Sequence, residues 1–300
     1  MFKSGFVSVI GRPNVGKSTF LNALIGQKIS AISDKAQTTR NIINIIYTED
    51  DMQVVFLDTP GIQQPKNKLG DYMLKISESA LNDVDAITYI VDCSPTIGKL
   101  DSYIIEKLQE VSANIPIILL INKIDQIPKE GLLEIINMYN KIGIFKEIIP
   151  ISALKNDGIK QYINSLRDYL KEGPQFYPED MITDKSERFV VSEIIREKAL
   201  RNLKEEVPHG IAVTIESMKE RKNKDLTDIS ATIYVERAAH KKIVIGENGK
   251  MIKKIGIDSR KEIENLIDSK VNLKLWVKVN QKWRDEEKGL NKFGYTIWVI

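Results

Sequence analysis

The chain has 300 residues, with 44 Lys and Arg against 41 Asp and Glu, which gives a formal net charge of +3. Hydrophobic residues make up 42% of it and charged residues 28%, which excludes a disordered or fibrous chain. The single cysteine, Cys93, excludes a disulfide framework and indicates a reducing compartment. Neither a secretory apolar region nor a bilayer-spanning apolar run is recognisable, so we expect a cytoplasmic protein.

Residues 1–171 alternate apolar, strand-like runs with helical stretches, the pattern of a doubly wound α/β sheet. The predicted strands are Phe6–Ile10, Ile42–Tyr47, Met52–Leu57, Ala86–Val91, Pro116–Ile121 and Glu147–Ile151. The predicted helices are Ser18–Leu24, Asp71–Leu81, Asp101–Val111, Leu132–Lys141 and Gly158–Leu170. One pair of strands is expected to be antiparallel, and the whole segment is expected to form one domain.

The turn after the first strand carries the pattern of a phosphate-binding loop. It reads Gly11-Arg12-Pro13-Asn14-Val15-Gly16-Lys17-Ser18 between a predicted strand and a predicted helix. Glycines let the backbone approach phosphate, and the helix N-terminus favours an anion. Lys17 is expected to contact the β- and γ-phosphates, and the Ser18 hydroxyl to ligate magnesium. A glycine-rich turn with a solvated lysine is the alternative, and the strand–turn–helix context disfavours it.

The loop between Ile29 and Asn44 is expected to sense the γ-phosphate. It contains Gln37-Thr38-Thr39-Arg40 just before the second predicted strand. One threonine hydroxyl, which we assign to Thr39 rather than Thr38, is predicted to complete the magnesium shell when the triphosphate is bound. A polar surface loop whose threonines simply start a strand is an open alternative.

The third predicted strand ends in a second nucleotide motif, Asp58-Thr59-Pro60-Gly61. Asp58 is expected to hold magnesium through a water molecule, and the Gly61 amide to contact the γ-phosphate. Many small GTPases place a glutamine after this glycine to orient the attacking water, but Ile62 cannot act in that way. We therefore assign catalysis to Lys17, Thr39 and Gly61, with slow turnover that accelerates on a ribonucleoprotein partner as one possibility.

Two further motifs are expected to recognise guanine. The apolar run Ile117–Ile121 ends in Asn122-Lys123-Ile124-Asp125. A carboxylate at Asp125 can accept from both guanine donors, whereas adenine lacks that pair of donors. Asn122 is expected to brace neighbouring loops, and the Lys123 stem to lie along the base. The last motif consists of Ser152, Ala153 and Leu154. Its backbone amides are expected to contact the guanine oxygen.

Together these motifs predict an enzyme that binds GTP with Mg²⁺ and hydrolyses it to GDP and phosphate. A kinase or ATPase with a phosphate-binding loop would share Gly11–Ser18, but it would have no need of the guanine motif. Competition between ATP and GTP would separate the two classes.

Residues 172–186 are predicted to link the first domain to a second one at 187–300, because two prolines and a glycine interrupt the helical pattern. The balance of charge also changes here. Residues 1–180 carry an excess of acidic side chains, and the rest of the chain carries an excess of basic ones. Clustered basic residues usually only form a solvated surface. The motif around them therefore decides whether they indicate a binding site.

That context is the pattern of a type II KH domain. A helix at Arg188–Leu203 and strands near Ile211–Ile215 and Ile229–Val235 precede a Gly-x-x-Gly turn, and a helix at Met251–Ile267 and a strand at Val271–Val279 follow it. Such a domain binds about four unpaired nucleotides beside its Gly-x-x-Gly loop. The residues predicted to bind RNA are Lys242, Gly246, Glu247, Asn248, Gly249, Lys250, Lys253 and Lys254. The acidic Glu247 departs from a basic loop and shifts the expected electrostatic contribution to the lysines.

The whole chain resembles bacterial GTPases of the Era family. The resemblance rests on the phosphate loop, on Gln37–Arg40 and on two later segments, Ser192–Lys198 and Leu275–Val279. It implies a cytoplasmic GTPase, partly peripheral on the inner membrane, that binds the 3′ end of small-subunit ribosomal RNA and acts in maturation of the small ribosomal subunit. Similarity to GTPases that use potassium in place of an arginine finger suggests Asn14 as a K⁺ ligand.

A membrane-associated or stress-signalling GTPase is the alternative within the GTPases, and the KH pattern disfavours it. An RNA-binding module with a degenerate nucleotide site is the other, and it would release no phosphate. The protein is expected to be a monomer.

Overall fold

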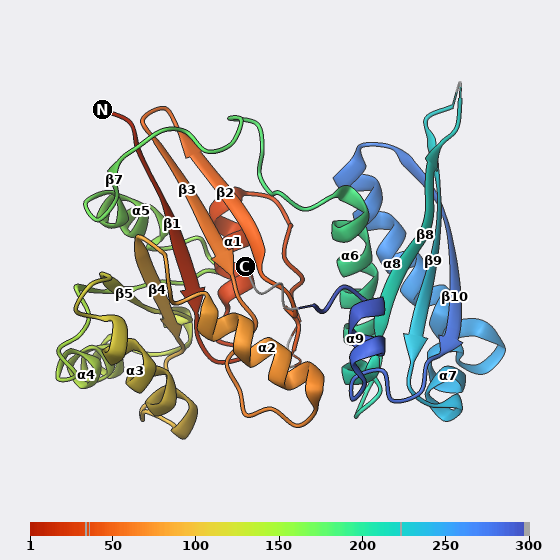
Figure 1. The fold of residues 1–300 in the computed structure, drawn as a ribbon, viewed down its shortest axis with the longest axis horizontal. Coiled ribbons are helices and arrows are strands. Elements are labelled where there is room, and N and C mark those ends of the chain that lie inside the picture. Colours follow the sequence, from red (N-terminus) through yellow and green to blue (C-terminus); the bar gives the residue numbers. More distant parts are fainter. Residues whose placement is uncertain (34, 36, 223, 297–300) are drawn as a thin grey trace. The chain divides into compact units, whose positions relative to one another are not determined.

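The structure is a computed structural model that describes residues 1–33, 35, 37–222 and 224–296. Two residues of the expected switch loop, Asp34 and Ala36, and the last four residues of the expected second domain lie outside this description. The chain divides into two compact units (Figure 1). The first comprises Met1–Ser30, Thr39–Gln64 and Met73–Asp184, and the second comprises Ala31–Thr38, Pro65–Tyr72 and Lys185–Ile300.

The first unit contains the predicted α/β sheet. Its strands lie in the order β2-β3-β1-β4-β5-β6, and a short strand, β7, pairs with β1. The strands are β1 (Lys3–Ile10), β2 (Ile43–Glu49), β3 (Met52–Asp58), β4 (Ala86–Val91), β5 (Ile117–Ile121), β6 (Glu147–Pro150) and β7 (Lys171–Glu172). The expected antiparallel pair is β2 with β3. β7 also runs antiparallel to β1, and its two residues are too few for a sequence pattern to reveal.

Helices cover both faces of this sheet. They are α1 (Lys17–Ile25), α2 (Lys68–Ser79), α3 (Lys99–Val111), α4 (Lys129–Asn140) and α5 (Ile159–Arg167). On one face, Ile104 and Leu108 of α3 and Tyr139 of α4 pack in a buried cluster with β4 and β5. On the other face, Phe20 of α1 meets Tyr162 of α5 with ring centroids 5.2 Å apart. The central strands, buried from both sides, are accordingly mostly apolar, and β5 is apolar along its whole length.

This topology positions the predicted motifs. β3 and β4 both run parallel to β1, and β5 runs parallel to β4. The carboxyl ends of β1, β3 and β5 therefore lie at the same edge of the sheet. Ligands of open α/β sheets bind at that edge. The phosphate loop follows β1, Asp58 ends β3, and the Asn122 motif follows β5.

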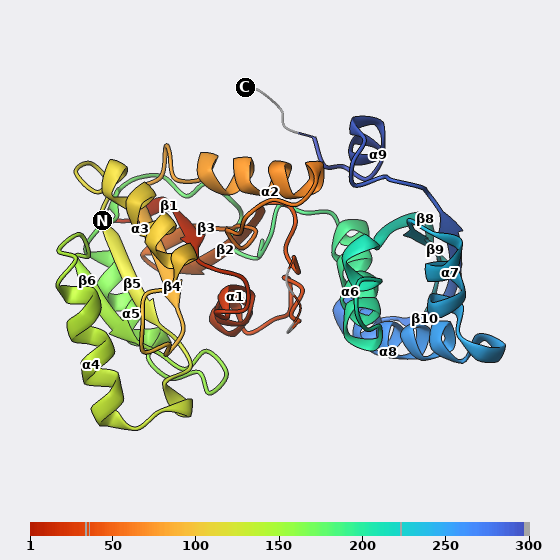
Figure 2. The ribbon, with the colours of Figure 1, turned by 90° about the horizontal axis from the view of Figure 1, so that it is seen from below.

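The second unit has the element order predicted for a type II KH domain. Its three strands lie in the order β10-β9-β8, with β8 antiparallel and β10 parallel to β9. The elements are α6 (Glu187–Asn202), β8 (Ala212–Glu220), β9 (Leu226–Val235), α7 (Ala238–Ile245), α8 (Lys250–Ile267), β10 (Lys270–Val279) and α9 (Glu287–Lys292). Two one-turn helices, η2 (Pro208–Gly210) and η3 (Glu247–Gly249), lie between them. Figure 2 shows α6 and α8 along one face of this sheet.

The core of the second unit lies between those helices and the sheet. Ile195 of α6, Ile255 of α8 and Ile233 of β9 are fully buried in it. α9 is absent from the sequence prediction because six residues are too few to show a periodic pattern. Its neighbourhood is aromatic, with the rings of Trp283 and Phe293 5.0 Å apart. Among the described residues, no helix has the length and apolar character that crossing a bilayer requires.

The segment predicted to be a linker is hydrogen-bonded to the first unit along much of its length. Gln53 of β3 accepts from the backbone amides of Phe176 and Tyr177 at 2.8 and 2.9 Å. The Ile46 amide donates to the Ile182 carbonyl at 3.0 Å. Prolines in this segment prevent regular structure but leave its other amides and carbonyls free to pair with a neighbouring strand.

Candidate functional site

The phosphate loop has the backbone of a tight strand-to-helix turn. Asn14 and Gly16 both have positive φ, at 67° and 101°. A Cβ atom at Gly16 would lie 2.2 Å from Nδ2 of Asn122, so only glycine fits there. Asn122 in turn donates to the Val15 carbonyl at 2.8 Å. The loop is therefore shaped partly by the guanine motif, and Asn122 braces it as expected.

Lys17 begins α1 and is buried in the loop. Its ammonium donates to the carbonyls of Gly11 and Arg12 at 3.0 and 2.9 Å. Burial lowers the pKa of Lys17 to about 8, and the charge of Asp58 opposes that shift. Negative phosphate oxygens would favour the charged ammonium, so this position suits a ligand that restores the lost solvation.

The three residues predicted to bind magnesium lie together. The Ser18 hydroxyl is 3.1 Å from the Thr39 hydroxyl and 3.2 Å from Oδ2 of Asp58. Thr39 also donates to this Asp58 oxygen at 3.4 Å. The other Asp58 oxygen, Oδ1, is buried without a hydrogen-bond partner in the described part of the chain. A hard cation such as Mg²⁺ prefers oxygen ligands of this kind, so the donor set fits the ion.

Burial raises the pKa of Asp58, and the charge of Lys17 acts against this increase. A buried carboxylate with one orphaned oxygen is costly unless a cation or donor reaches it. Among the described residues, no group of three His, Cys, Asp or Glu side chains could hold a metal ion. Asp58 is therefore the one carboxylate of this magnesium donor set, and the hydroxyls of Ser18 and Thr39 supply its other protein oxygens.

The structure separates the two candidate threonines. The Thr38 hydroxyl donates to the Lys35 carbonyl at 2.7 Å, so it is engaged within its own loop. Only Thr39 lies beside Ser18 and Asp58. This geometry supports Thr39 as the magnesium ligand and gives Thr38 a role in the loop backbone.

The motif after β3 contributes mainly structure. The Thr59 hydroxyl donates to the Val9 carbonyl at 2.8 Å, and the Pro60 carbonyl accepts from Ser77 at 2.9 Å. A Cβ atom at Gly61 would lie 2.7 Å from the backbone nitrogen of Pro13, which requires glycine at this position. Ile62 is 1% exposed and belongs to the apolar core. It therefore has neither the chemistry nor the position to orient water.

The guanine motif is a network of hydrogen bonds. Oδ1 of Asn122 accepts from the amides of Lys123 and Ala153 at 2.8 and 3.0 Å. Lys123 has φ of 69° and donates to the Asn14 carbonyl at 2.7 Å. The Asn122 side chain thus connects the loops after β1, β5 and β6, while the Lys123 stem spans from one to another.

Asp125 lies half-exposed in the one-turn helix η1 (Ile124–Gln126). The Ser152 hydroxyl donates to its Oδ1 at 2.6 Å, and this bond lowers the pKa of Asp125. The carboxylate is therefore held ionised, as acceptance from two guanine donors requires.

The backbone amides after β6 already have acceptors in the protein. The Ser152 amide donates to the Asp157 carbonyl at 3.0 Å, and the Ala153 amide donates to Asn122. The neighbouring Leu154 is an exposed side chain. Contact of these amides with a guanine oxygen stays a prediction. Each N–H would have to donate to the guanine oxygen as well as to its present acceptor in the protein.

Arg12 has a partner that its sequence pattern did not reveal. Its Nε lies 2.7 Å from Oδ2 of the buried Asp101 on α3, and Tyr89 donates to the other oxygen of this carboxylate at 2.8 Å. A second ion pair joins Arg12 to Asp92 at 2.9 Å. These contacts fix the outer arm of the phosphate loop. The only sequence signal was an acidic residue in the first turn of a predicted helix.

The Gly-x-x-Gly turn of the second unit has positive φ at both its glycines, and steric space excludes a side chain only at the first. Gly246, Asn248 and Gly249 have positive φ, at 73°, 50° and 75°. A Cβ atom at Gly246 would lie 2.7 Å from Cβ of Met251, whereas one at Gly249 would meet nothing within 4 Å. The turn therefore presents open backbone at Gly249, with the exposed side chains of Glu247 and Lys250 beside it.

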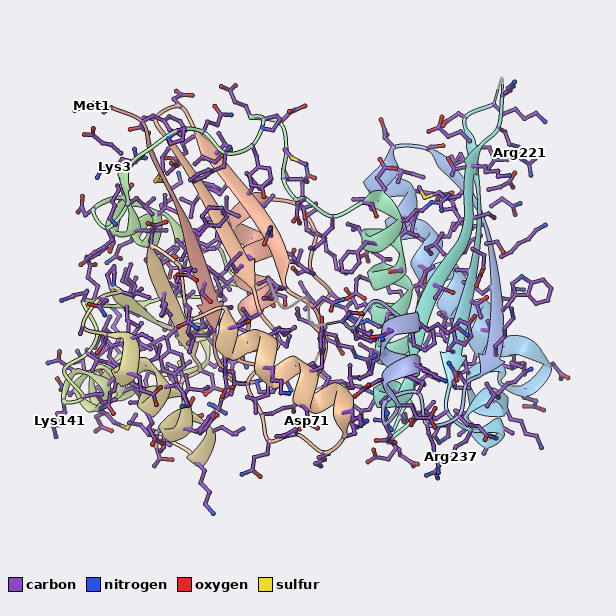
Figure 3. The ribbon with its side chains drawn as sticks, in the orientation of Figure 1. Met1, Lys3, Asp71, Lys141, Arg221 and Arg237 are labelled. Atoms are coloured by element: carbon purple, nitrogen blue, oxygen red, sulfur yellow. The ribbon has the colours of Figure 1, made fainter. Side chains whose placement is uncertain are left out.

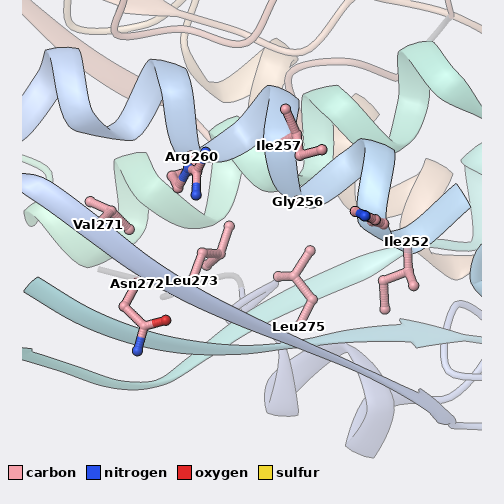
Figure 4. Close-up of a pocket in the computed structure, with 9 residues that line it drawn as sticks. Ile252, Gly256, Ile257, Arg260, Val271, Asn272, Leu273 and Leu275 are labelled. Atoms are coloured by element: carbon pink, nitrogen blue, oxygen red, sulfur yellow. The ribbon is translucent and has the colours of Figure 1, made fainter. Parts of the chain in front are cut away.

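A groove of about 310 Å³ follows this turn. It lies between α8 and β10, where apolar side chains from the two elements face one another (Figure 4). Lys253 and Arg260 supply its positive charge, and Gly256 leaves its floor open, with Leu275 3.5 Å from where a Cβ would stand. The other lining residues are Ile252, Ile257, Val271, Asn272 and Leu273. Of these residues only Lys253 was predicted to bind RNA, although alternation along β10 could have indicated the apolar wall of the groove.

Lys254 lies on a different side of α8. It lines a polar depression between α8 and α6, together with Lys198, Asp258 and Glu262. The predicted basic cluster is therefore divided: Lys253 borders the apolar groove, and Lys254 does not.

The second unit also includes the segment Ala31–Thr38, which α6 holds by its backbone. Glu197 accepts from the Ile32 amide at 2.9 Å, and Arg196 donates to the Thr38 carbonyl. Arg201 donates to the Ile32 carbonyl at 3.0 Å. These charged residues had no predicted role. A possible signal was that Arg196, Glu197 and Lys198 are consecutive in a predicted helix, where neighbouring side chains point about 100° apart, so the three cannot share one solvent-facing side.

Two family models match the two parts of the chain, one described as "50S ribosome-binding GTPase" over residues 6–123 and one as "KH domain" over residues 206–284. A protein named GTPase Era from Clostridioides difficile is 54% identical over 297 residues, which cover 99% of each chain. This chain belongs to the Era family of GTPases. Another Era, from Clostridium kluyveri, is 53% identical over 98% of this chain and 100% of its own. The predicted GTPase activity and KH domain are confirmed by this membership.

Solved Era structures match the whole chain. Era in complex with MgGDPNP and nucleotides 1506–1542 of 16S ribosomal RNA is 40% identical, with a TM-score of 0.94, covering 99% of this chain and 100% of its own. A tyrosine-to-alanine variant of Aquifex aeolicus Era bound to GDP·AlF₄⁻ is 39% identical, with the same TM-score and coverage.

Proposed function

We propose that this GTPase uses its nucleotide cycle to control binding of the 3′ end of small-subunit ribosomal RNA during assembly of the small ribosomal subunit. The observation that carries the proposal is that a single chain contains both a guanine-nucleotide site, formed by the loops after β1, β3, β5 and β6, and a KH groove between α8 and β10. The similar Era structure with both MgGDPNP and 16S ribosomal RNA supports this pairing. The alternative of a membrane or stress-signalling switch would leave the groove of α8 and β10 unexplained.

In the nucleotide site, Lys17 would neutralise phosphate oxygens, and the Gly61 amide would donate to the γ-phosphate. A magnesium ion held by Ser18, Thr39 and Asp58 would offset charge that develops on the phosphates. Asp125 would select guanine. Because Ile62 is apolar and buried, turnover without a partner should be slow.

We also propose a potassium ion beside Asn14, because its side-chain amide oxygen is an acceptor that a hard cation can use. Its positive φ, at 67°, turns it away from regular helix or strand geometry at the tip of the phosphate loop. A monovalent cation there would take the place of an arginine finger. Equal hydrolysis rates in sodium and potassium would remove this part of the proposal.

The segment Ala31–Thr38 suggests how nucleotide and RNA could be linked. Thr39, which lies beside Ser18 and Asp58, directly follows this segment, and Arg196 of α6 binds the Thr38 carbonyl. Release of Thr39 after hydrolysis would loosen the backbone that α6 holds. RNA that favours the ordered segment would then favour GTP reciprocally.

The remaining expectations follow the family and are proposed on the same basis. The protein would act in the cytoplasm as a monomer, with peripheral contact to the inner face of the cell membrane as a secondary location. We further propose that the GTPase domain ends at residue 171 and the KH domain begins at residue 187.

The RNA part of the function is tested with Gly249 variants. Gly249→Asp places a negative charge at the open turn, whereas Gly249→Asn adds a similar side chain that also tolerates positive φ. We expect Gly249→Asp to weaken binding of a 3′-end ribosomal RNA fragment on the order of tenfold more than Gly249→Asn, with GTP binding unchanged in both. Equal RNA affinities for parent and both variants would place RNA elsewhere.

A further inference from the structure

The C-terminal segment of the second unit, residues 280–296, is built around a buried tryptophan. Trp283 is fully buried, and its indole Nε1 donates to the Gly210 carbonyl at 2.9 Å. Its ring packs edge-on against Phe293 with centroids 5.0 Å apart and stacks with Tyr295 at 5.8 Å. Buried aromatic rings with a satisfied indole N–H fix a backbone firmly. The C-terminal segment is therefore an ordered part of the second unit and not a loose tail.

This segment contacts the beginning of α2. The residues Pro65–Tyr72, which include the first turn of α2, belong to the second unit. The Leu69 amide donates to the Arg284 carbonyl at 3.0 Å. The ring of Tyr72 meets that of Tyr295 edge-on, with centroids 5.8 Å apart, and both tyrosines are buried. One backbone hydrogen bond and one buried ring pair therefore anchor this end of the helix.

The Arg284 carbonyl acts as part of the N-terminal cap of α2. The first amides of a helix have no acceptor inside the helix and need one from elsewhere. Asn67 serves two of them: its side chain accepts from the Gly70 amide at 2.9 Å, and its carbonyl accepts from the amide of Asp71, labelled in Figure 3, at 3.0 Å. The Leu69 amide takes its acceptor from Arg284 instead. A residue distant in sequence thus completes the cap.

The other end of α2 is bonded to the nucleotide motif after β3. Ser77 is fully buried, and its hydroxyl donates to the Pro60 carbonyl at 2.9 Å. Pro60 precedes Gly61, whose amide is proposed to contact the γ-phosphate. α2 is one continuous helix from Lys68 to Ser79, and a continuous helix moves largely as a rigid element. A shift of its first turn would therefore displace the backbone of this motif.

We propose that the C-terminal segment is a clamp on α2, in which Arg284 and Tyr295 hold the first turn of the helix and thereby position the Pro60–Gly61 backbone for GTP hydrolysis. Small misplacements of a reacting arrangement slow a reaction strongly, so a distant clamp can matter for the rate. The exposed ion pair of Lys68 with Glu287, at 3.8 Å, adds little to it. Tyr295 is then a positioning residue that acts through α2. The clamp concerns GTP hydrolysis and stands apart from the RNA proposal.

The test compares three variants of the full-length protein by single-turnover hydrolysis and by GDP affinity. Tyr295→Leu should slow hydrolysis about fivefold and change GDP affinity less than about twofold, because only the γ-phosphate contact is displaced. Tyr295→Phe should keep most of the rate, since its ring can still meet Tyr72 edge-on. Phe293→Leu, the matched control, removes a ring whose aromatic partners are Tyr234 and Trp283, and it should slow hydrolysis less.

Hydrogen exchange tests the clamp in the parent protein, whether or not the variants fold. The Leu69 amide should exchange on the order of tenfold more slowly than a first-turn amide without an acceptor. Rapid exchange at Leu69 in the parent would overturn the clamp. A parent-like hydrolysis rate in Tyr295→Leu would also overturn it, as would equal losses of rate and GDP affinity. An equal loss of rate in Phe293→Leu would assign the effect to the stability of the segment and contradict the positioning role.

Discussion

In the nucleotide site, the side chains expected to contact GTP also contact one another, whereas those of the RNA groove contact mainly the core of their own unit. Asn122 alone joins three loops, and Ser18, Thr39 and Asp58 share hydrogen bonds. The groove has an apolar wall, and Lys253 and Arg260 supply its positive charge. One site is specified by mutual hydrogen bonds, and the other by shape and charge. Single substitutions should therefore have large effects on GTP and graded effects on RNA.

The largest effect is expected at Asp125. Asp125→Asn keeps an oxygen for Ser152 but replaces the second acceptor with a donor, so it opposes the exocyclic amine of guanine. GTP affinity should fall on the order of a hundredfold, and affinity for xanthosine triphosphate should rise. Competition binding with both nucleotides measures the change. Parent-like affinity for GTP would show that Asp125 does not read the base.

A smaller effect separates the two neighbouring threonines. Thr39→Ala removes a hydroxyl beside Ser18 and Asp58, so hydrolysis should slow by more than about tenfold while GDP affinity changes less. Thr38→Ala, the matched control, removes only the bond to the Lys35 carbonyl and should slow hydrolysis less. Single-turnover assays with GTP measure both rates. The assignment fails if Thr38→Ala is the slower variant.

GTP affinity should also fall as the pH rises. Burial puts the pKa of Lys17 at about 8 in the ligand-free protein. Bound phosphates would favour the ammonium, so binding above this pH takes up a proton, and affinity should drop about eightfold between pH 7.5 and 9. Lys17→Arg keeps its positive charge over this pH range. Whatever its GTP affinity at pH 7.5, that affinity should not change with pH. A flat profile in the parent would contradict the role of Lys17.

The smallest effect is expected in the RNA groove. Lys253→Ala should lower affinity for single-stranded RNA about threefold and reduce the salt slope by about 0.7, because one phosphate contact is lost. Lys254→Ala, on the side of α8 towards α6, is the matched control and should change both less. Titrations at several salt concentrations compare them. A larger loss in Lys254→Ala would place the RNA on the other side of the helix.

The sequence predicted most of the fold because its signals were local. The strand-to-helix turn at Gly11–Ser18 and the period-two pattern of Val271–Val279 each specify an element with few alternatives. It could not predict contacts that depend on tertiary packing. The pairing of Arg12 with Asp101 joins residues far apart in sequence, and the separation of Lys253 from Lys254 depends on the exact rotation of α8.

The same limit applies to α6. Its charged residues were legible in the sequence, but nothing local indicated that Glu197 and Arg201 would hold the backbone of Ile32. Short elements such as β7 and α9 were missed because two or six residues carry no detectable period. Packing, rather than propensity, decides such segments.

The most direct test of the account measures RNA affinity with the protein bound to GDP and to a non-hydrolysable GTP analogue. The probe is the 3′-end fragment of small-subunit ribosomal RNA, and the analogue's own affinity is measured with and without it. The account predicts that the analogue tightens RNA binding about fivefold or more and that RNA tightens the analogue by the same factor. Equal RNA affinities in the two nucleotide states would contradict it and leave two independent modules in one chain.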